Sequence, residues 1–162
     1  MQEIERKFLI SPDKIPVLSH ETIHNSLHIE QFYIQIDPEI RFRKVVIGYT
    51  ECRHYYKTEK TKTNDPIVRG EKEEKITEDE YYDNYPRHIG NVIIKRRYMI
   101  QLEDKYWCSA DVYNDDLCIA EVEFKNIEEA KAWIPPEWFG EEITGVKEYK
   151  NVNIATKRGE LK

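Results

Sequence analysis

The chain has 162 residues, a length that suits one domain with a single core, so we expect residues 1–162 to form one domain. Charged residues make up 35% of the chain and hydrophobic residues 40%, with 11 Tyr and 5 Phe, which is enough apolar surface to fold. The net charge of -6 argues against a general nucleic-acid binder, because such proteins need a basic surface.

The three cysteines, Cys52, Cys108 and Cys118, lack the paired spacing of a disulfide framework or a cysteine zinc site, which indicates a reducing compartment. The N-terminal residues contain no apolar signal-peptide core, and no run approaches the ~20 apolar residues of a membrane span. The sequence therefore predicts a soluble cytoplasmic protein that binds neither nucleic acid nor membrane.

The first expected strand alternates charged residues with others. Glu3, Glu5 and Lys7 occupy every second position, so a strand places two carboxylates and an ammonium group on one face. Seven further strands are expected at residues 28–37, 40–47, 54–60, 67–76, 92–102, 105–113 and 117–124, because these stretches are rich in β-branched and aromatic residues and are bounded by turn signals, including residues 37–39 and 114–116.

Two short helices are expected between or after these strands. Thr77 and Glu80 have the spacing of a capping box, and Pro86 limits the helix that they start. Asn126 is expected to cap a second helix that runs to Trp133 before the two prolines at 135–136.

A competing motif lies before the second strand, where residues 20–24 read HETIH and match the zinc-protease pattern HExxH. That pattern binds zinc only on a helix, whereas Thr22 and Ile23 are β-branched and a strand follows within a few residues. We therefore expect loop or strand-edge histidines and no zinc site. We likewise expect Trp107, Trp133 and Trp138 to pack outside the strands rather than to stack on bases.

The alternation of the first strand returns along the chain and predicts the fold. Any single pair of alternating charges is most often a solvated cross-strand salt bridge, but the repeated series indicates one shared charged interior. We predict a mainly β (α+β) fold: an eight-stranded, antiparallel, closed β-barrel with helices packed outside over its apolar face, and a C-terminal helix. The expected inward side chains are Glu3, Glu5, Glu71, Glu73, Asp111, Glu121 and Glu123, and Lys7, Arg41, Arg43, Lys60, Arg69, Lys95 and Arg97.

Seven acids thus meet seven bases inside the expected barrel. Burying unpaired charge is costly, so the charges must be paired, hydrated or used to bind a charged ligand. A balanced lining suits a metal-phosphate ligand, since carboxylates bind hard cations and Arg or Lys bind phosphate oxygens.

In this order the residues resemble the CYTH, or triphosphate tunnel metalloenzyme, superfamily over nearly the whole chain. Its ExExK signature matches residues 3–7, and the RxR, RxExE, KxR and ExE pairs follow at residues 41–43, 69–73, 95–97 and 121–123. Residues 135–144 and 149–151 are similar to the C-terminal part of short bacterial members. The chain departs from them at Val146 and Glu148, where those relatives tend to have an acid and an arginine.

The resemblance implies a tunnel that binds a triphosphate together with Mg²⁺ or Mn²⁺. By it, Glu3, Glu5, Glu121 and Glu123 would hold the cation, with Asp111 as a further direct or water-mediated ligand. The phosphate oxygens would be bound by Lys7, Arg41, Arg43, Lys60, Lys95 and Arg97, with Lys147 or Lys150 added from the C-terminal helix. Arg69, Glu71 and Glu73 would join the site or brace it. No residue is identified as a general base.

The expected activity is metal-dependent hydrolysis of inorganic triphosphate to phosphate and pyrophosphate, because nothing in the chain resembles a base-recognition pocket. The alternatives are a class IV adenylate cyclase or a thiamine or nucleoside triphosphatase of the same superfamily, or a noncatalytic polyphosphate-binding module. The expected partner is in each case a small molecule that carries a triphosphate, and a homodimer is compatible with every alternative.

Overall fold

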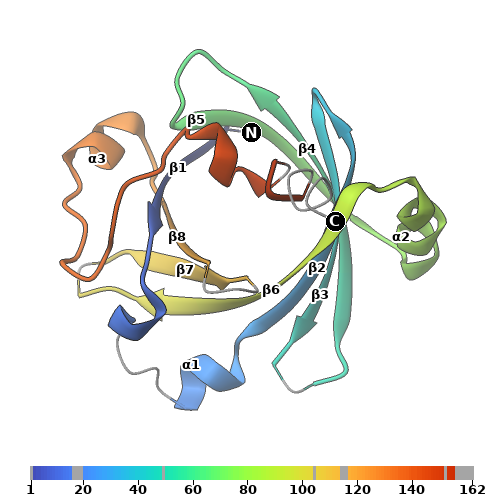
Figure 1. Cartoon of the computed structure of the whole chain (residues 1–162), viewed down its shortest axis with the longest axis horizontal. Helices are drawn as coiled ribbons and strands as arrows, with labels where there is room; N and C mark the ends of the chain where they lie inside the picture. The colour runs from blue at the N-terminus through green and yellow to red at the C-terminus, as the bar shows by residue number, and fades with distance from the viewer. Residues whose placement is uncertain are drawn as a thin grey trace.

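Eight antiparallel strands close into a barrel in the computed structural model, which describes residues 2–15, 20–48, 50–103, 105–113, 117–151 and 153–155 (Figure 1). The strands are β1 (Gln2–Leu9), β2 (Leu27–Ile36), β3 (Glu39–Ile47), β4 (Arg53–Lys62), β5 (Val68–Ile76), β6 (Ile89–Gln101), β7 (Trp107–Val112) and β8 (Cys118–Glu123). The predicted eight-stranded barrel is confirmed. The expected turn at 114–116 lies outside the described residues.

The order of strands around the barrel is β1-β5-β4-β3-β2-β6-β7-β8. Most neighbours follow one another in sequence, but β1 lies between β5 and β8, and β2 pairs with β6 as well as with β3. These non-local pairs bring the N-terminal strand beside strands from the middle and the end of the chain.

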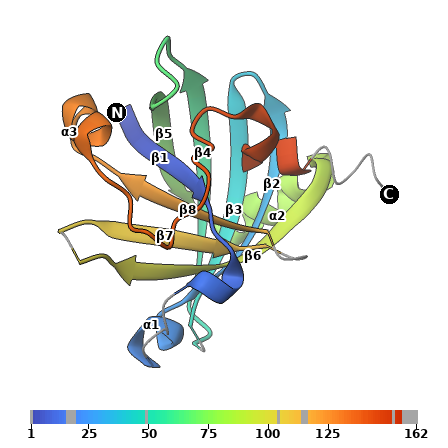
Figure 2. The ribbon, with the colours of Figure 1, turned by 60° about the vertical axis from the view of Figure 1, so that its left-hand side comes forward.

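The apolar face of the barrel points outward and is covered by helices. The helices α2 (Glu78–Asn84) and α3 (Ile127–Ala132) lie outside the barrel on opposite sides (Figures 1 and 2). Both predicted caps are present, because the side chain of Thr77 accepts a hydrogen bond from the Glu80 amide at 3.2 Å and that of Asn126 from the Glu129 amide at 2.7 Å. These bonds satisfy amides that the first turn of a helix leaves without a partner.

Two clusters of buried side chains fill the space beneath these helices. Near α2, Phe32 stacks on Phe42 with ring centroids 5.3 Å apart, and Tyr81 packs against Phe32. Near α3, the rings of Phe8 and Trp133 pack edge to face. The hydrophobic core of this barrel is therefore its outer layer, which leaves the interior to polar groups.

Arg6 fastens the segment that follows α3 to the outside of β1. Its guanidinium pairs with Glu142 at 2.7 Å and donates to the carbonyl oxygens of Ala130 and Trp133 at 2.9 and 2.8 Å. Beyond Arg6, the backbone of residues 141–143 hydrogen-bonds to that of residues 7–9.

The expectation for residues 20–24 is wrong, because His20–His24 form the short helix α1. Three 3-10 turns occur at Pro12–Lys14, Tyr85–Arg87 and Lys147–Tyr149. Residues 151 and 153–155 are helical, and Ile154 and Ala155 pack in one cluster with Tyr33 and Tyr113. The C-terminal segment thus crosses one end of the barrel, as Figure 1 shows. Among the described residues, no helix is long and apolar enough to cross a membrane.

Candidate functional site

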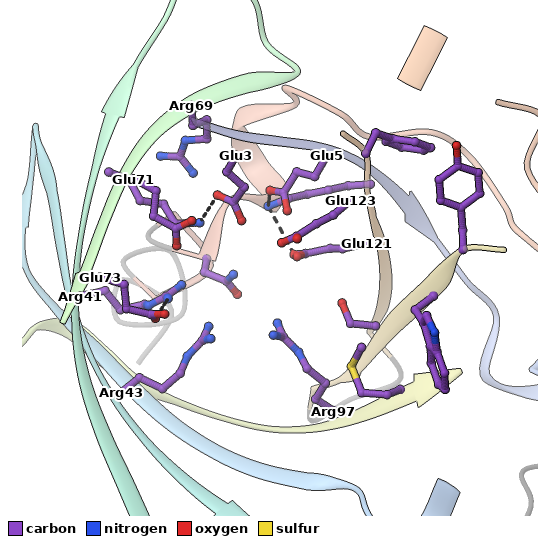
Figure 3. A pocket seen from close by; sticks show the side chains of 18 of the residues that line it. Glu3, Glu5, Arg41, Arg43, Arg69, Glu71, Glu73, Arg97, Glu121 and Glu123 are labelled. Atoms are coloured by element: carbon purple, nitrogen blue, oxygen red, sulfur yellow. Dashed lines mark hydrogen bonds and ion pairs between the residues drawn. The ribbon is translucent and has the colours of Figure 1, made fainter. Parts of the chain in front are cut away.

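A cavity of about 710 Å³ occupies the barrel interior, and every strand contributes to its lining (Figure 3). Twelve of the fourteen side chains that we predicted to point inward line it, which confirms the strand parity on which the prediction depended. The two exceptions are Lys95 and Asp111, which share the inward parity but are fully buried and do not line the cavity. Within the described part of the chain, the lining carries eight carboxylates and eight basic side chains, so it is balanced in formal charge.

Three carboxylates gather in one corner of the cavity. Glu3, Glu5 and Glu123 each offer an oxygen within 4.8 Å of the others, and they are the one group of potential metal ligands found among the described residues. Glu5 lies directly opposite Glu123 in the β1–β8 pair. Its Oε2 atom is buried without a hydrogen-bond partner. Like charges opposite each other destabilise a sheet, so this corner favours a bound cation.

The pKa values around this corner reflect the crowding. Burial and the charge of Glu121 raise the pKa of Glu5 to about 8. Burial and the charge of Glu3 also raise the pKa of Glu123. Without a cation, the charged form of these carboxylates is disfavoured.

Two neighbouring carboxylates are instead held in their charged form by lysines. Burial acts to raise the pKa of Glu3, but Lys60 lies 2.8 Å from it and brings its pKa below the ordinary value. For Glu121 burial is outweighed by Lys7, whose ammonium lies 3.5 Å away, and by Arg97, so that its pKa is about 2. Glu121 lines the cavity beside the cluster.

Arginines face the carboxylates from the other wall. In Figure 3, Arg43 and Arg97 reach into the cavity from the side opposite Glu5 and Glu123. The Arg43 guanidinium donates through Nε and Nη2 to the side-chain oxygen of Gln31, at 2.8 and 2.6 Å. The other terminal nitrogen of Arg43, Nη1, takes no part in these two hydrogen bonds to Gln31. An anchored guanidinium suits the bidentate recognition of phosphate oxygens.

Arg41 is positioned from the adjacent strands. Its Nη2 donates to the buried Thr58 hydroxyl at 3.2 Å, and Thr58 in turn donates to Glu73 at 3.0 Å. The Glu73 carboxylate lies 3.8 Å from the same guanidinium nitrogen.

Asp111, on β7, pairs with two basic side chains of the neighbouring strand β6. Its two oxygens accept from Arg97 at 2.6 and 2.8 Å, and Lys95 lies 2.7 Å from one of them. Burial acts to raise the pKa of Asp111, but these two cations bring it far below the ordinary value. Asp111, expected as a further direct or water-mediated ligand, lies outside the carboxylate cluster, and both of its oxygens are committed to bases.

Glu39 is a lining residue that the sequence analysis missed by treating it as part of a turn. Its carboxylate pairs with Arg69 at 2.6 Å. Glu39 shares the alternation of Arg41 and Arg43, so extending the third strand by one residue gives the signal that could have found it.

The positions of Lys147 and Lys150 show which of these two candidate phosphate-binding lysines lies near the barrel. Lys147 is exposed and lines neither the main cavity nor a second cavity of about 100 Å³, whereas Lys150 lines the second one. Only Lys150 of the two is therefore near the barrel interior.

One expectation about the tryptophans is wrong. Trp133 is buried in the outer core, but Trp107 is 52% exposed and lines the cavity with Tyr106, Phe124 and Met99. Trp107 shares the parity of Asp111 on β7, a signal that the sequence already contained. The cavity therefore has an apolar edge as well as a charged centre.

The HExxH segment remains without a described metal site. Its backbone is helical, but the side chains of residues 20 and 21 lie outside the described part of the structure. The described residues thus place their single carboxylate cluster in the barrel and not at α1.

No family model matches the chain, but individual proteins do. The inorganic triphosphatase of Nitrosomonas europaea is 32% identical over 96% of this chain and 97% of its own length. The inorganic triphosphatase of Acetivibrio thermocellus is 29% identical over 94% of this chain and 92% of its own. The crystal structure of an inorganic triphosphatase superposes with a TM-score of 0.63 at 32% identity, covering 95% of this chain and 94% of that chain.

Proposed function

The chain belongs to the CYTH, or triphosphate tunnel metalloenzyme, superfamily, and we propose that it hydrolyses inorganic triphosphate to phosphate and pyrophosphate with the help of a divalent cation. The observation that carries the proposal is the division of the cavity into a carboxylate cluster at Glu3, Glu5 and Glu123 and a facing wall of anchored arginines. We further propose that it acts in the cytoplasm, which suits its three unpaired cysteines.

Mg²⁺ or Mn²⁺ fits the carboxylate cluster. These are hard cations that prefer oxygen ligands, and Oε2 of Glu5 is a buried acceptor without a hydrogen-bond partner, while the Oε1 atom of the same carboxylate lies 3.7 Å from the Lys7 ammonium. Glu3, Glu5 and Glu123 would hold the ion, with Glu121 beside them. The bound ion would supply charge neutralisation and polarisation of a phosphate oxygen.

The chain's own residues supply the rest of the catalysis. Phosphoryl transfer needs positioning and charge stabilisation rather than a covalent intermediate, so the basic residues matter most. Arg41, Arg43 and Arg97 would bind phosphate oxygens from one wall, and Lys7 and Lys60 from the side of the carboxylates. Asp111 would orient Arg97 by accepting both of its donated hydrogen bonds.

The reaction balances with water as the only co-substrate. Water attacks the terminal phosphorus in line with the bridging oxygen, the bond from phosphorus to that oxygen breaks, and pyrophosphate leaves. Closing the barrel end with the C-terminal segment limits the access of bulk water and strengthens the electrostatic interactions in the cavity.

A second candidate function is hydrolysis of a triphosphate that carries an organic group. The specific observation in its favour is the apolar edge formed by Tyr106, Trp107 and Phe124, since a ring stacked there would gain binding energy. A Trp107→Ala variant separates the two functions. It should lower kcat/KM for thiamine triphosphate or ATP alone if the edge binds an organic group, and should leave inorganic triphosphate unaffected.

The proposal is tested by measuring phosphate release from inorganic triphosphate, ATP and thiamine triphosphate with Mg²⁺, Mn²⁺ or excess chelator. We expect fast release from inorganic triphosphate that chelator abolishes. Formation of cyclic AMP from ATP would instead identify a cyclase. Tight triphosphate binding without turnover of any substrate, with metal present, would identify a binding module.

A further inference from the structure

The wall of the barrel has a gap beside the signature residues of β1. At its start β1 pairs with β5, and the Glu5 amide still donates to the Ile67 carbonyl oxygen at 3.1 Å. Two residues later the Lys7 amide donates to the Thr144 hydroxyl at 3.0 Å, and from there residues 141–143 replace β5 as the neighbour of β1. The partner of β1 therefore changes between Glu5 and Lys7.

The second cavity, of about 100 Å³, lies at this change of partner. It lies between the connection from β4 to β5 and residues 143–150. The side chains of Glu5, Lys7 and Arg69 border both this cavity and the main one. The space suits a few waters or one tetrahedral oxyanion and is far too small for a nucleoside. It adjoins the corner in which we place the cation.

The second cavity differs from the main one in its charge. Four basic side chains, Lys7, Lys62, Arg69 and Lys150, line it against the two carboxylates of Glu5 and Asp65. One of these carboxylates is partly satisfied locally, because Asp65 accepts a hydrogen bond from the Ile67 amide at 3.0 Å. Counted by its own lining, this cavity has two more basic side chains than carboxylates. Lys7 and Arg69 also pair with Glu121 and Glu39 of the main cavity, whereas Lys62 and Lys150 form no ion pair with a described residue, which favours an anion between them.

Two further observations point to a bound anion. The Nε atom of Arg69 is buried without a hydrogen-bond partner, although Nη2 of the same guanidinium pairs with Glu39. In addition, burial and the charge of Arg69 lower the pKa of Lys150, which shows that the bases crowd one another. An anion between them would satisfy the free donor and relieve the repulsion.

One wall of the second cavity depends on the close contact between Gly145 and Pro66. Gly145 has a φ of +75°, and a Cβ atom at that position would lie 2.8 Å from the Cβ of Pro66. Glycine alone allows both the left-handed backbone and this contact, so residues 143–146 can lie close against the connection from β4 to β5.

We propose that the second cavity is a subsite for one phosphate group, adjacent to the reaction centre and held by Lys62, Lys150 and Arg69. This inference rests on the proposed function. The phosphate group has two sources with the same chemistry: orthophosphate released by hydrolysis, or the fourth phosphate of a chain longer than triphosphate.

The test compares Lys62→Met and Lys150→Met with Lys75→Met, which removes the same charge from an exposed position on β5 outside both cavities. Orthophosphate binding is measured by calorimetry, and kcat/KM is measured for triphosphate and for tetraphosphate. Thermal melting confirms that each variant is folded.

We expect Lys62→Met and Lys150→Met to weaken orthophosphate binding about tenfold or more, the scale of one charged hydrogen bond. Lys62→Met should also keep kcat/KM for triphosphate within about threefold of the unaltered protein, because Lys62 does not line the main cavity. A matching rise in the inhibition constant of orthophosphate, with the preference for tetraphosphate unchanged, would identify the released product. A selective loss of kcat/KM for tetraphosphate would identify the longer chain.

Two outcomes would overturn the inference. Either both variants behave like Lys75→Met in binding and in kinetics, or orthophosphate binding depends on Arg43 of the main cavity and not on Lys62 or Lys150. Because calorimetry needs no turnover, a protein that fails to hydrolyse triphosphate yet binds orthophosphate through Lys62 and Lys150 would refute the proposed function and leave the anion subsite in place.

Discussion

Glu5 and Glu123 face each other directly across the β1–β8 pair, although 118 positions separate them in the chain. The pKa of both carboxyl groups is raised, for Glu5 to about 8, because Glu5 is buried, Glu123 is partly desolvated, and both lie close to other carboxylates. Like charges that lie opposite each other in a strand pair lower the stability of the fold. Such a pair is retained where a bound cation needs both carboxylates.

Glu123→Gln should therefore change activity and stability in opposite directions. Metal-dependent hydrolysis of triphosphate should fall about 100-fold or more, since one group that organises charge at the reaction centre is lost. With chelator present, the free energy of unfolding in urea should rise by up to about 1 kcal/mol, because the repulsion from Glu3 is relieved. Glu74→Gln, on the exposed face of β5, should alter neither quantity. Unchanged turnover in Glu123→Gln would remove Glu123 from the site.

The affinity for the cation should rise with pH. The ligand form of Glu5 is the charged one, and its pKa lies at about 8 instead of near 4.5, so cation binding must displace a proton over this interval. Titration with Mn²⁺ should show affinity increasing from pH 6 to pH 8 and a proton released on binding, and Glu5→Gln should show no such release. An affinity independent of pH in the unaltered protein would contradict this account.

The same raised pKa predicts how the metal-free protein responds to pH. The folded state keeps the Glu5 proton to a higher pH than the unfolded state does, so this group makes unfolding easier as the pH rises from about 4.5 to 8. Urea denaturation with chelator should show this loss of stability. Glu5→Gln should reduce the slope, and added Mn²⁺ should oppose it.

Arg43→Ala should weaken the capture of triphosphate. The guanidinium is anchored by Gln31 and supplies a charged hydrogen bond worth roughly 1.5–3 kcal/mol, so KM should rise about 10- to 100-fold. Mn²⁺ affinity in the absence of substrate should be nearly unchanged. Arg53→Ala, at an exposed position on β4, is the matched control for the loss of an arginine. A KM equal to that of the control would exclude Arg43 from phosphate binding.

Asp111→Asn tests whether this residue holds the cation or positions Arg97. Both oxygens already accept from Arg97, and Lys95 also pairs with the carboxylate, so we expect a brace. Triphosphate kcat/KM should fall roughly 10- to 100-fold while the affinity for Mn²⁺ stays within about twofold. A loss of Mn²⁺ affinity comparable to that of Glu5→Gln would restore the role of Asp111 as a metal ligand.

Arg6→Ala should lower stability without changing substrate binding, because Arg6 lies on the outer face of β1. Arg6 points away from the cavity and fastens residues 130–142 through Glu142 and two carbonyl oxygens. The free energy of unfolding should fall by roughly 2 kcal/mol, since two partly buried carbonyl oxygens lose their donor. At temperatures where the variant is folded, KM for triphosphate should change little, because no side chain of the cavity is altered. A large rise in KM without loss of stability would show that Arg6 acts on the substrate.

Much of this protein follows from the period of two in its strands. Alternation alone shows that Glu3, Glu5 and Lys7 share a face, and likewise Arg41 with Arg43 and Glu121 with Glu123, because successive side chains of a strand point to opposite sides. The apolar partners on the other face then require cover from helices, and the Thr77 and Asn126 caps indicate where these begin.

The tertiary structure alone decided which strands are neighbours. A local pattern shows on which face a side chain lies but not which strand lies beside it. The sequence therefore could not show that Glu5 lies opposite Glu123 or that Asp111 pairs with Arg97 and Lys95. It also could not show the gap beside Lys7. Nor could it show that residues 20–24 are helical. These features arise from barrel closure, in which non-local pairing sets the register and tertiary packing overrides local propensity.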